Sequence, residues 1–451
     1  MILTLIALPL VVAVLLLPLR RYRYICALLS AGALAVLVAA LTAPAETNAW
    51  LLFGRSLNLP AFESMVLAAC FALLALTLLY SNWVPQGEQV YATTLGITAI
   101  FVASTALRNI ALATLLLEAG IIASAMLVPS ERPGAALGGM RALVLLALAG
   151  PLLLVGAWAI ESYASQPERV QLLQTAVITL TLGYGIALGV VPFHVWLPAI
   201  YQHGRVLAVV MLHIVVPAML LLHLGNLAQI AAWPGEQTYM LGLMSATGVV
   251  TAIAGSIMAL TQRTVGRAIG YAALADFGIV LLALGLGTPD SARAAFLHMG
   301  YRGVAVMTAA MGVGVLQRVL GGDGVDDLRG AFRRAPLAML GVMLGGLSLA
   351  GMPLTAGFTT RMTVYGLLAA ERPQLGLLLV ASSFGPAWAV ARYALAAWVS
   401  TPSVESRERL APGALIALLS LALLAVGIWP DLVQSLAGPW LRTILGSVVW
   451  Q

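Results

Sequence analysis

The sequence has 451 residues, of which 61% are hydrophobic and only 9% are charged, and its mean hydropathy is +0.99. Soluble domains carry roughly 25% charged residues, so this composition excludes a soluble protein and indicates an integral membrane protein. The net charge is +6, and all of the basic residues are arginine because the chain contains no lysine.

Hydrophobic runs cover the chain almost from end to end. A helix needs about 20 apolar residues to cross a bilayer, so we expect an all-α polytopic protein of about fourteen transmembrane helices in a single integral membrane domain, residues 1–451. The predicted spans are 1–18, 24–43, 62–80, 90–107, 110–128, 140–160, 172–199, 206–224, 239–260, 267–287, 293–317, 336–367, 374–399 and 413–429. Cys26 and Cys70 lie inside these spans without metal-ligand spacing, so we expect packing residues and no metal site.

Arginines are concentrated in the odd-numbered connections between the predicted spans. The even-numbered connections carry fewer, namely Arg55, Arg108, Arg169, Arg293 and Arg372. Arginine-rich connections stay in the cytoplasm, so we expect a multi-pass protein of the inner (cytoplasmic) membrane with both termini outside. The basic charge therefore has a topological explanation and does not indicate a nucleic-acid partner.

Two predicted spans are interrupted by proline. The first carries GVVPFHVWLP at 189–198, with Pro192 and His194, and the second carries GMPLTAGF, with Pro353. Proline removes a backbone donor and breaks a helix. Paired breaks are typical of transporters built from inverted repeats, so we expect two inverted five-helix repeats near 90–224 and 239–399. A simple kink satisfied by neighbouring helices is the alternative for each proline.

The segment GYGIALGVVPFHVWLPAIYQHG resembles the signature of the antiporter-like membrane subunits of NADH:quinone oxidoreductase (complex I). Multisubunit cation/proton antiporters and membrane-bound hydrogenases share this signature. RNIALATLLLEAGIIASAML, GRAIGYAALADFGIVLLALG, FLHMGYRGVAVM and GMPLTAGFTTR are similar to further helices of the family in the same order. The chain length favours the shorter, M-like or N-like, subunit types.

The resemblance implies a proton path through charged residues in mid-membrane. Glu118 matches the family glutamate of the fifth helix, and an acid inside an apolar helix is a functional candidate by default. Its alternative is a packing hydrogen bond from a protonated carboxyl. His213 in the eighth helix and His298 in the eleventh are the titratable candidates. Arg361 occupies the lysine or glutamate position of the twelfth helix, where a permanently charged guanidinium sets a field but relays protons poorly.

Several positions depart from the family pattern. Ala187 and Val306 stand where the family has lysine. Asp276 replaces a neutral polar residue, and we expect it either to join the path or to form a structural ion pair with Arg302 or Arg361. We expect His194 either to orient backbone groups or water at the first break, or to be a structural histidine of a tight turn. His203 and His223 are expected near helix ends, exposed to water and without a role.

Two functions compete. The first is a proton-translocating subunit of a respiratory complex I-type oxidoreductase, which we favour. The second is a degenerate structural or partner-binding subunit of such a complex. A subunit of a cation/proton antiporter or of a membrane-bound hydrogenase complex is a further alternative.

Catalysis of electron transfer is not expected in this chain, because it contains no nucleotide, iron-sulfur or metal motif. We expect it to be a non-redox subunit without a cofactor of its own. NADH, FMN, iron-sulfur clusters and quinone would belong to partner subunits, and the partners would be other membrane subunits and the lipid bilayer.

Overall fold

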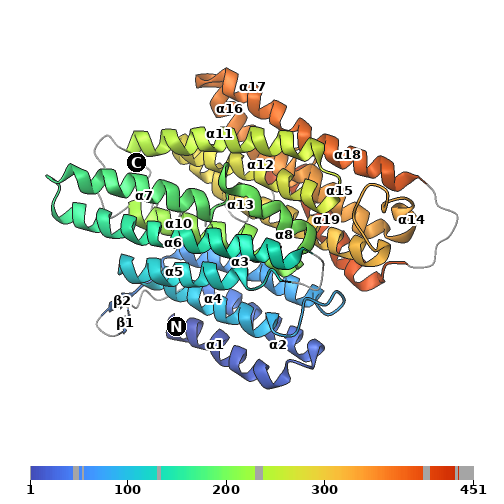
Figure 1. The fold of residues 1–451 in the computed structure, drawn as a ribbon, viewed down its shortest axis with the longest axis horizontal. Helices are drawn as coiled ribbons and strands as arrows, with labels where there is room; N and C mark the ends of the chain where they lie inside the picture. The colour runs from blue at the N-terminus through green and yellow to red at the C-terminus, as the bar shows by residue number, and fades with distance from the viewer. Residues whose placement is uncertain are drawn as a thin grey trace. The chain divides into compact units, whose positions relative to one another are not determined.

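The computed structural model describes residues 2–43, 50–52, 55–129, 134–228, 237–399, 407–431 and 435. Within these ranges the protein is nearly all helical (Figure 1), and eleven helices are long and apolar enough to cross a membrane. Three shorter apolar helices, α4, α5 and α15, accompany them. Each predicted span coincides with one to three helical elements, which confirms the polytopic all-α fold. The inverted relation between the two repeats stays a prediction.

The described residues form two compact units. Those of the first lie within Met1–Gly189 and Val210–Gln237, and those of the second within Val190–Val209 and Thr238–Leu445. The first contains α1 (Ile2–Leu19), α2 (Arg23–Thr42), β1 (Trp50–Leu52), β2 (Arg55–Leu57), α3 (Ala61–Tyr80), α4 (Val90–Ala106), α5 (Ile110–Ala125), α6 (Ala135–Ser165), α7 (Val170–Ala187), η2 (Met211–Val215) and α10 (Val216–Ala228).

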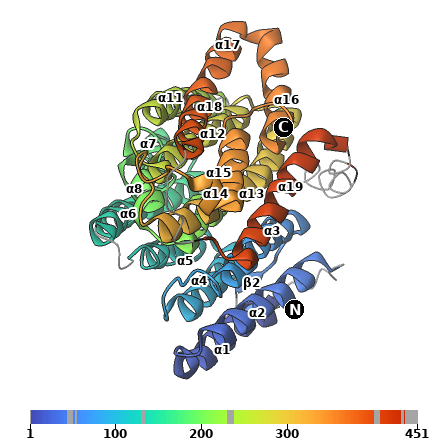
Figure 2. The ribbon, with the colours of Figure 1, turned by 90° about the vertical axis from the view of Figure 1, so that its right-hand side faces the viewer.

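Most helices of the first unit pack against their neighbours in sequence, and α1 also packs against α4. α1 packs against both α2 and α4, α2 packs against α3, and α6 packs along α7 (Figures 1 and 2). α5 lies between α4 and α6 and begins at Asn109, whose side chain accepts a hydrogen bond from the backbone N–H of Leu112. Such a cap satisfies an amide that a helix start leaves without a partner. The antiparallel hairpin β1–β2 is a small element that the sequence analysis did not predict.

The second unit is organised around α12 and α13. It contains η1 (Phe193–Trp196), α8 (Leu197–His203), α12 (Val265–Gly285), α13 (Pro289–Leu320), α14 (Ala331–Arg334), α15 (Pro336–Leu349), α16 (Ala356–Glu371), α17 (Pro373–Ser382), α18 (Phe384–Trp398) and α19 (Leu410–Ile428), whereas α9 (Val206–Val210) and α11 (Gln237–Thr261) each have an end residue in the first unit. α12 packs against α8 and α13, and α13 packs against α15 (Figure 1). Gly278 allows α12 to approach α11 closely, because a Cβ there would lie 2.5 Å from the backbone N of Ala252.

Both predicted helix breaks are present. α7 ends at Ala187, Gly189 adopts φ +63°, and the chain enters the 3₁₀ turn η1 after a cis bond between Val191 and Pro192. The second break separates α15 from α16 and contains Pro353. Leu354 has φ +68° there, a conformation that costs a non-glycine residue on the order of 1–3 kcal/mol and is concentrated at functional sites.

Candidate functional site

A buried charged cluster lies at the second break, in the second unit. Asp276 of α12 is only 1% exposed, and its Oδ1 is 2.6 Å from Nη2 of Arg361 and 2.9 Å from Nε2 of His298. Its Oδ2 is 3.6 Å from Nε of Arg302. Asp276 therefore forms the ion pair that the sequence analysis gave as one alternative, and it does so with Arg302 and Arg361 at once. A buried carboxylate tolerates desolvation only when it is paired and hydrogen-bonded.

Arg361 of α16 joins this cluster to the end of α15. Its Nη1 donates to the carbonyl oxygen of Ala350 at 2.9 Å and to Oγ of Ser383 at 2.9 Å, and its Nη2 donates to the carbonyl of Leu349. The last carbonyls of a helix have no partner within it, and a cation there also complements the helix dipole. Arg361 is therefore the C-terminal cap of α15 as well as the partner of Asp276.

The opposite end of α15 is held by a carboxylate. Glu408, which precedes α19, accepts hydrogen bonds from the backbone N–H of Leu337 at 2.8 Å and of Ala338 at 3.0 Å. Its own N–H donates to the carbonyl of Arg334. An anion at the N-terminus and a cation at the C-terminus both stabilise the helix, so α15 is fixed at each end by a side chain from another element.

His298 of α13 is the titratable group beside these fixed charges. Because a carboxylate only accepts, Nε2–H of His298 donates to Asp276, and Nδ1 is left to accept from the hydroxyl of Thr360 at 2.6 Å. The two guanidinium groups outnumber the single carboxylate.

Glu118 lies in the first unit, away from any salt bridge among the described residues. Its carboxyl is half-buried against Gly150 of α6, where a Cβ atom would overlap Oε1. No hydrogen-bond partner for Oε1 is found within the described ranges. The structure therefore does not bring Glu118 into an ion pair with His213, and glycine at 150 makes the space that the carboxyl occupies.

His213 is only 1% exposed and lies in η2, a π-helical turn that packs against α3 and α5. Single π-helical turns inside helices occur frequently at functional sites. His194, at the first break, is buried with its ring 6.0 Å from that of Tyr271. Its Nδ1 has no hydrogen-bond partner among the described residues.

His223 corrects an expectation. It is not exposed at a helix end but 5% exposed inside the first unit, with Nδ1 2.7 Å from the hydroxyl of Tyr184 and Nε2 2.8 Å from Oγ1 of Thr114. The sequence analysis missed this buried position because His223 lies outside the segments that resemble the family. A histidine on an otherwise apolar face, with Thr114 and Tyr184 on other apolar helices, was the available signal.

Metal coordination finds no support in the described part of the chain, which contains no group of three or more histidine, cysteine, aspartate or glutamate residues placed to hold an ion.

Comparison with known proteins gives a consistent family. NADH-quinone oxidoreductase subunit N 2 of Acidobacterium capsulatum is 29% identical over 223 residues, 48% of this chain and 44% of the relative, so the match spans about half of that protein. A chain of the membrane-bound sulfane sulfur reductase, an archaeal respiratory membrane complex, superposes with a TM-score of 0.84 at 21% identity, covering 98% of this chain and 97% of the other.

A chain of respiratory complex I from Thermus thermophilus superposes with a TM-score of 0.75 at 22% identity, covering 96% of this chain and 98% of the other. Residues 107–385, more than half of the sequence, match the family described as NADH:quinone oxidoreductase/Mrp antiporter, TM. These residues include both breaks, Glu118 and the Asp276 cluster. The protein is therefore a multi-pass membrane protein that belongs to the NADH:quinone oxidoreductase/Mrp antiporter family.

Proposed function

We propose that the chain is a proton-translocating, antiporter-like subunit of a respiratory complex of the NADH:quinone oxidoreductase type. The carrying observation is the buried cluster at the second break, where His298 bridges Asp276 and Thr360 beside two arginines. Charged groups inside a membrane protein are expensive and mark ion pathways. Glu118, His213, Asp276 and His298 are the proposed path, and Arg361 sets its electrostatics.

Partner subunits would supply the driving reaction. NADH, FMN, iron-sulfur clusters and quinone are proposed to bind there, in a complex of the inner membrane in which this chain has both termini outside. The breaks at Pro192 and Pro353 would expose backbone groups to water along the path, as in transporters with inverted repeats, and His194 would orient such groups at the first break.

A structural subunit is the second candidate, and two observations favour it. Ala187 and Val306 cannot carry protons, and Arg361 has both terminal nitrogens engaged in capping and pairing. In this case the Asp276 cluster would only hold the break together.

The deciding variant is Glu118→Gln, which keeps the shape and hydrogen bonding of the side chain but removes its titratable proton. The parent complex, purified and reconstituted in vesicles, should assemble normally and move fewer protons per electron transferred. An unchanged ratio would favour the structural subunit.

A further inference from the structure

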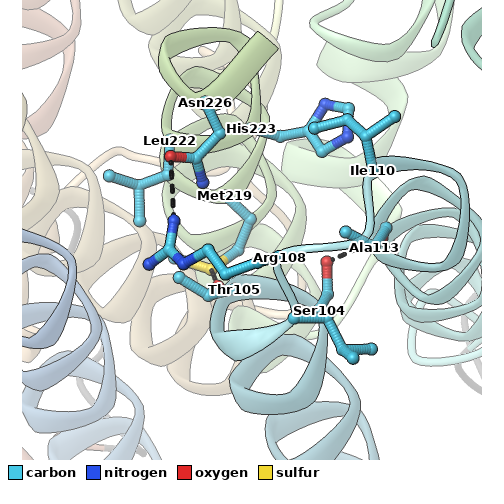
Figure 3. Close-up of a pocket in the computed structure, with 10 residues that line it drawn as sticks. Ser104, Thr105, Arg108, Ile110, Ala113, Met219, Leu222, His223 and Asn226 are labelled. Carbon is cyan, nitrogen blue, oxygen red and sulfur yellow. Dashed lines mark hydrogen bonds between the residues drawn. The ribbon is translucent and has the colours of Figure 1, made fainter. Parts of the chain in front are cut away.

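A cavity in the first unit, lined by both polar and apolar side chains, reaches His223 (Figure 3). It has a volume of about 260 Å³, room for several water molecules, and is bounded by the ends of α4 and α10 and the start of α5. Arg108 and Asn226 lie at the partly exposed rim of the cavity. Nη1 of Arg108 donates a hydrogen bond to Oδ1 of Asn226 at 3.4 Å. Glu63 of α3 holds Arg108 with a 2.9 Å ion pair. The buried side chain of His223 is part of the cavity wall.

The hydrogen bonds of His223 define a direction for proton movement. Thr114 donates its only hydroxyl hydrogen to the carbonyl of Ile110 at 2.7 Å, so it accepts from Nε2–H of His223. Nδ1 is then the acceptor for the hydroxyl of Tyr184. In the neutral imidazole, Nε2 is therefore protonated and Nδ1 is not. Each nitrogen is hydrogen-bonded to a hydroxyl on a different helix.

Both hydroxyls lie one turn from the positions where the family resemblance places the glutamate and the lysine. Thr114 precedes Glu118 by four residues on α5, and Tyr184 precedes Ala187 by three on α7. Residues at these spacings share one helix face. The His223 group therefore touches the two helix faces that would carry that pair, including the face where alanine has replaced lysine.

We propose that His223 and Tyr184 form the proton-exchanging site of the first unit, taking the place of the missing lysine, and that the cavity is its water-filled access. A proton reaching the Tyr184 oxygen displaces the tyrosine proton onto Nδ1. The imidazolium then releases the Nε2 proton to cavity water, so one proton enters and one leaves. A water-mediated transfer of the proton from Nδ1 to Nε2 then restores the starting tautomer. Arg108, Glu63 and Tyr184 are the ionisable side chains placed around the cavity and the ring.

This inference rests on the proposed function, and its test separates the two. His223→Gln and Tyr184→Phe are made in the complete complex, with Glu118→Gln for comparison and His203→Gln, in α8 of the other unit, as the matched control. Protons moved per electron are measured in vesicles with a pH-sensitive dye, beside assembly and melting temperature. We expect both variants to assemble, to lose as much translocation as Glu118→Gln, and to show no further loss when combined with it. His203→Gln should match the wild type.

Other outcomes are also decisive. A normal ratio in His223→Gln, with a lowered one in Glu118→Gln, would overturn the site and leave the proposed function standing. Normal ratios in all of them would overturn both. Loss of assembly in both His223→Gln and Tyr184→Phe would make the pair structural and would also overturn the site.

Water access is tested separately. With Cys26 and Cys70 replaced by alanine, Asn226→Cys should react with a membrane-impermeant thiol reagent applied on the side of the α4–α5 connection. No reaction from either side would show that the cavity is closed to water and would contradict the access route.

Discussion

Gly150 offers a way to move the Glu118 carboxyl without touching it. A Cβ atom at this position would overlap Oε1 and lie 3.0 Å from Oε2, closer than ordinary van der Waals contact. Because the carboxyl is the free end of a flexible side chain, Gly150→Ala should displace it by about 1 Å or more rather than unfold α6. A displacement of that size at a reacting group costs on the order of 100-fold in rate.

Stability should change little in this variant, since alanine is favoured over glycine within a helix by about 1 kcal/mol. We therefore expect normal assembly and a proton-to-electron ratio as low as that of Glu118→Gln. Gly139→Ala, in the same helix, is the control, because a Cβ there meets only Pro129 and Val128 at an ordinary 3.5 Å. A wild-type ratio in Gly150→Ala, when Glu118→Gln lowers it, would refute the reasoning that the position of the carboxyl matters.

Two further predictions concern the second unit and the topology. Arg361→Lys should lower the melting temperature of the complex, because one ammonium cannot replace the fork that binds both carbonyls and Asp276, and a lost charged hydrogen bond costs roughly 1.5–3 kcal/mol. The exposed Arg372→Lys is its control, and equal melting temperatures would contradict the capping role. Cysteines replacing Glu88 and Arg407, both exposed, should be labelled from the cytoplasmic side only. Labelling of both from outside would reverse the predicted orientation.

The sequence predicted the helices and breaks well because their causes are local. Apolar runs of sufficient length make membrane helices in any surroundings, and Pro192 and Pro353 interrupt them whatever packs nearby. The pairing of Asp276 with Arg302 or Arg361 was predicted on chemical grounds instead, since a buried acid requires a cation.

Features that depend on packing between helices could not be predicted. The contact of Glu118 with Gly150 joins α5 to α6, and nothing in either segment specifies the rotation that brings them together. His223 was expected to be exposed because its place near the end of an apolar run says nothing about Tyr184, which α7 brings to it from 39 residues away. The role of Arg361 as a cap likewise appears only when α15 is seen to end beside it.

The short length of α15 has a consequence for the choice of arginine at 361. Its 14 residues rise only about 21 Å, less than the roughly 30 Å of a bilayer core, and Leu349 and Ala350 at its C-terminal end are fully buried. A lysine there would uncap the helix each time it gave up its proton. Arginine, which keeps its charge at any physiological pH, makes this cap permanent and, in the function proposed above, leaves proton exchange in this unit to the neighbouring His298.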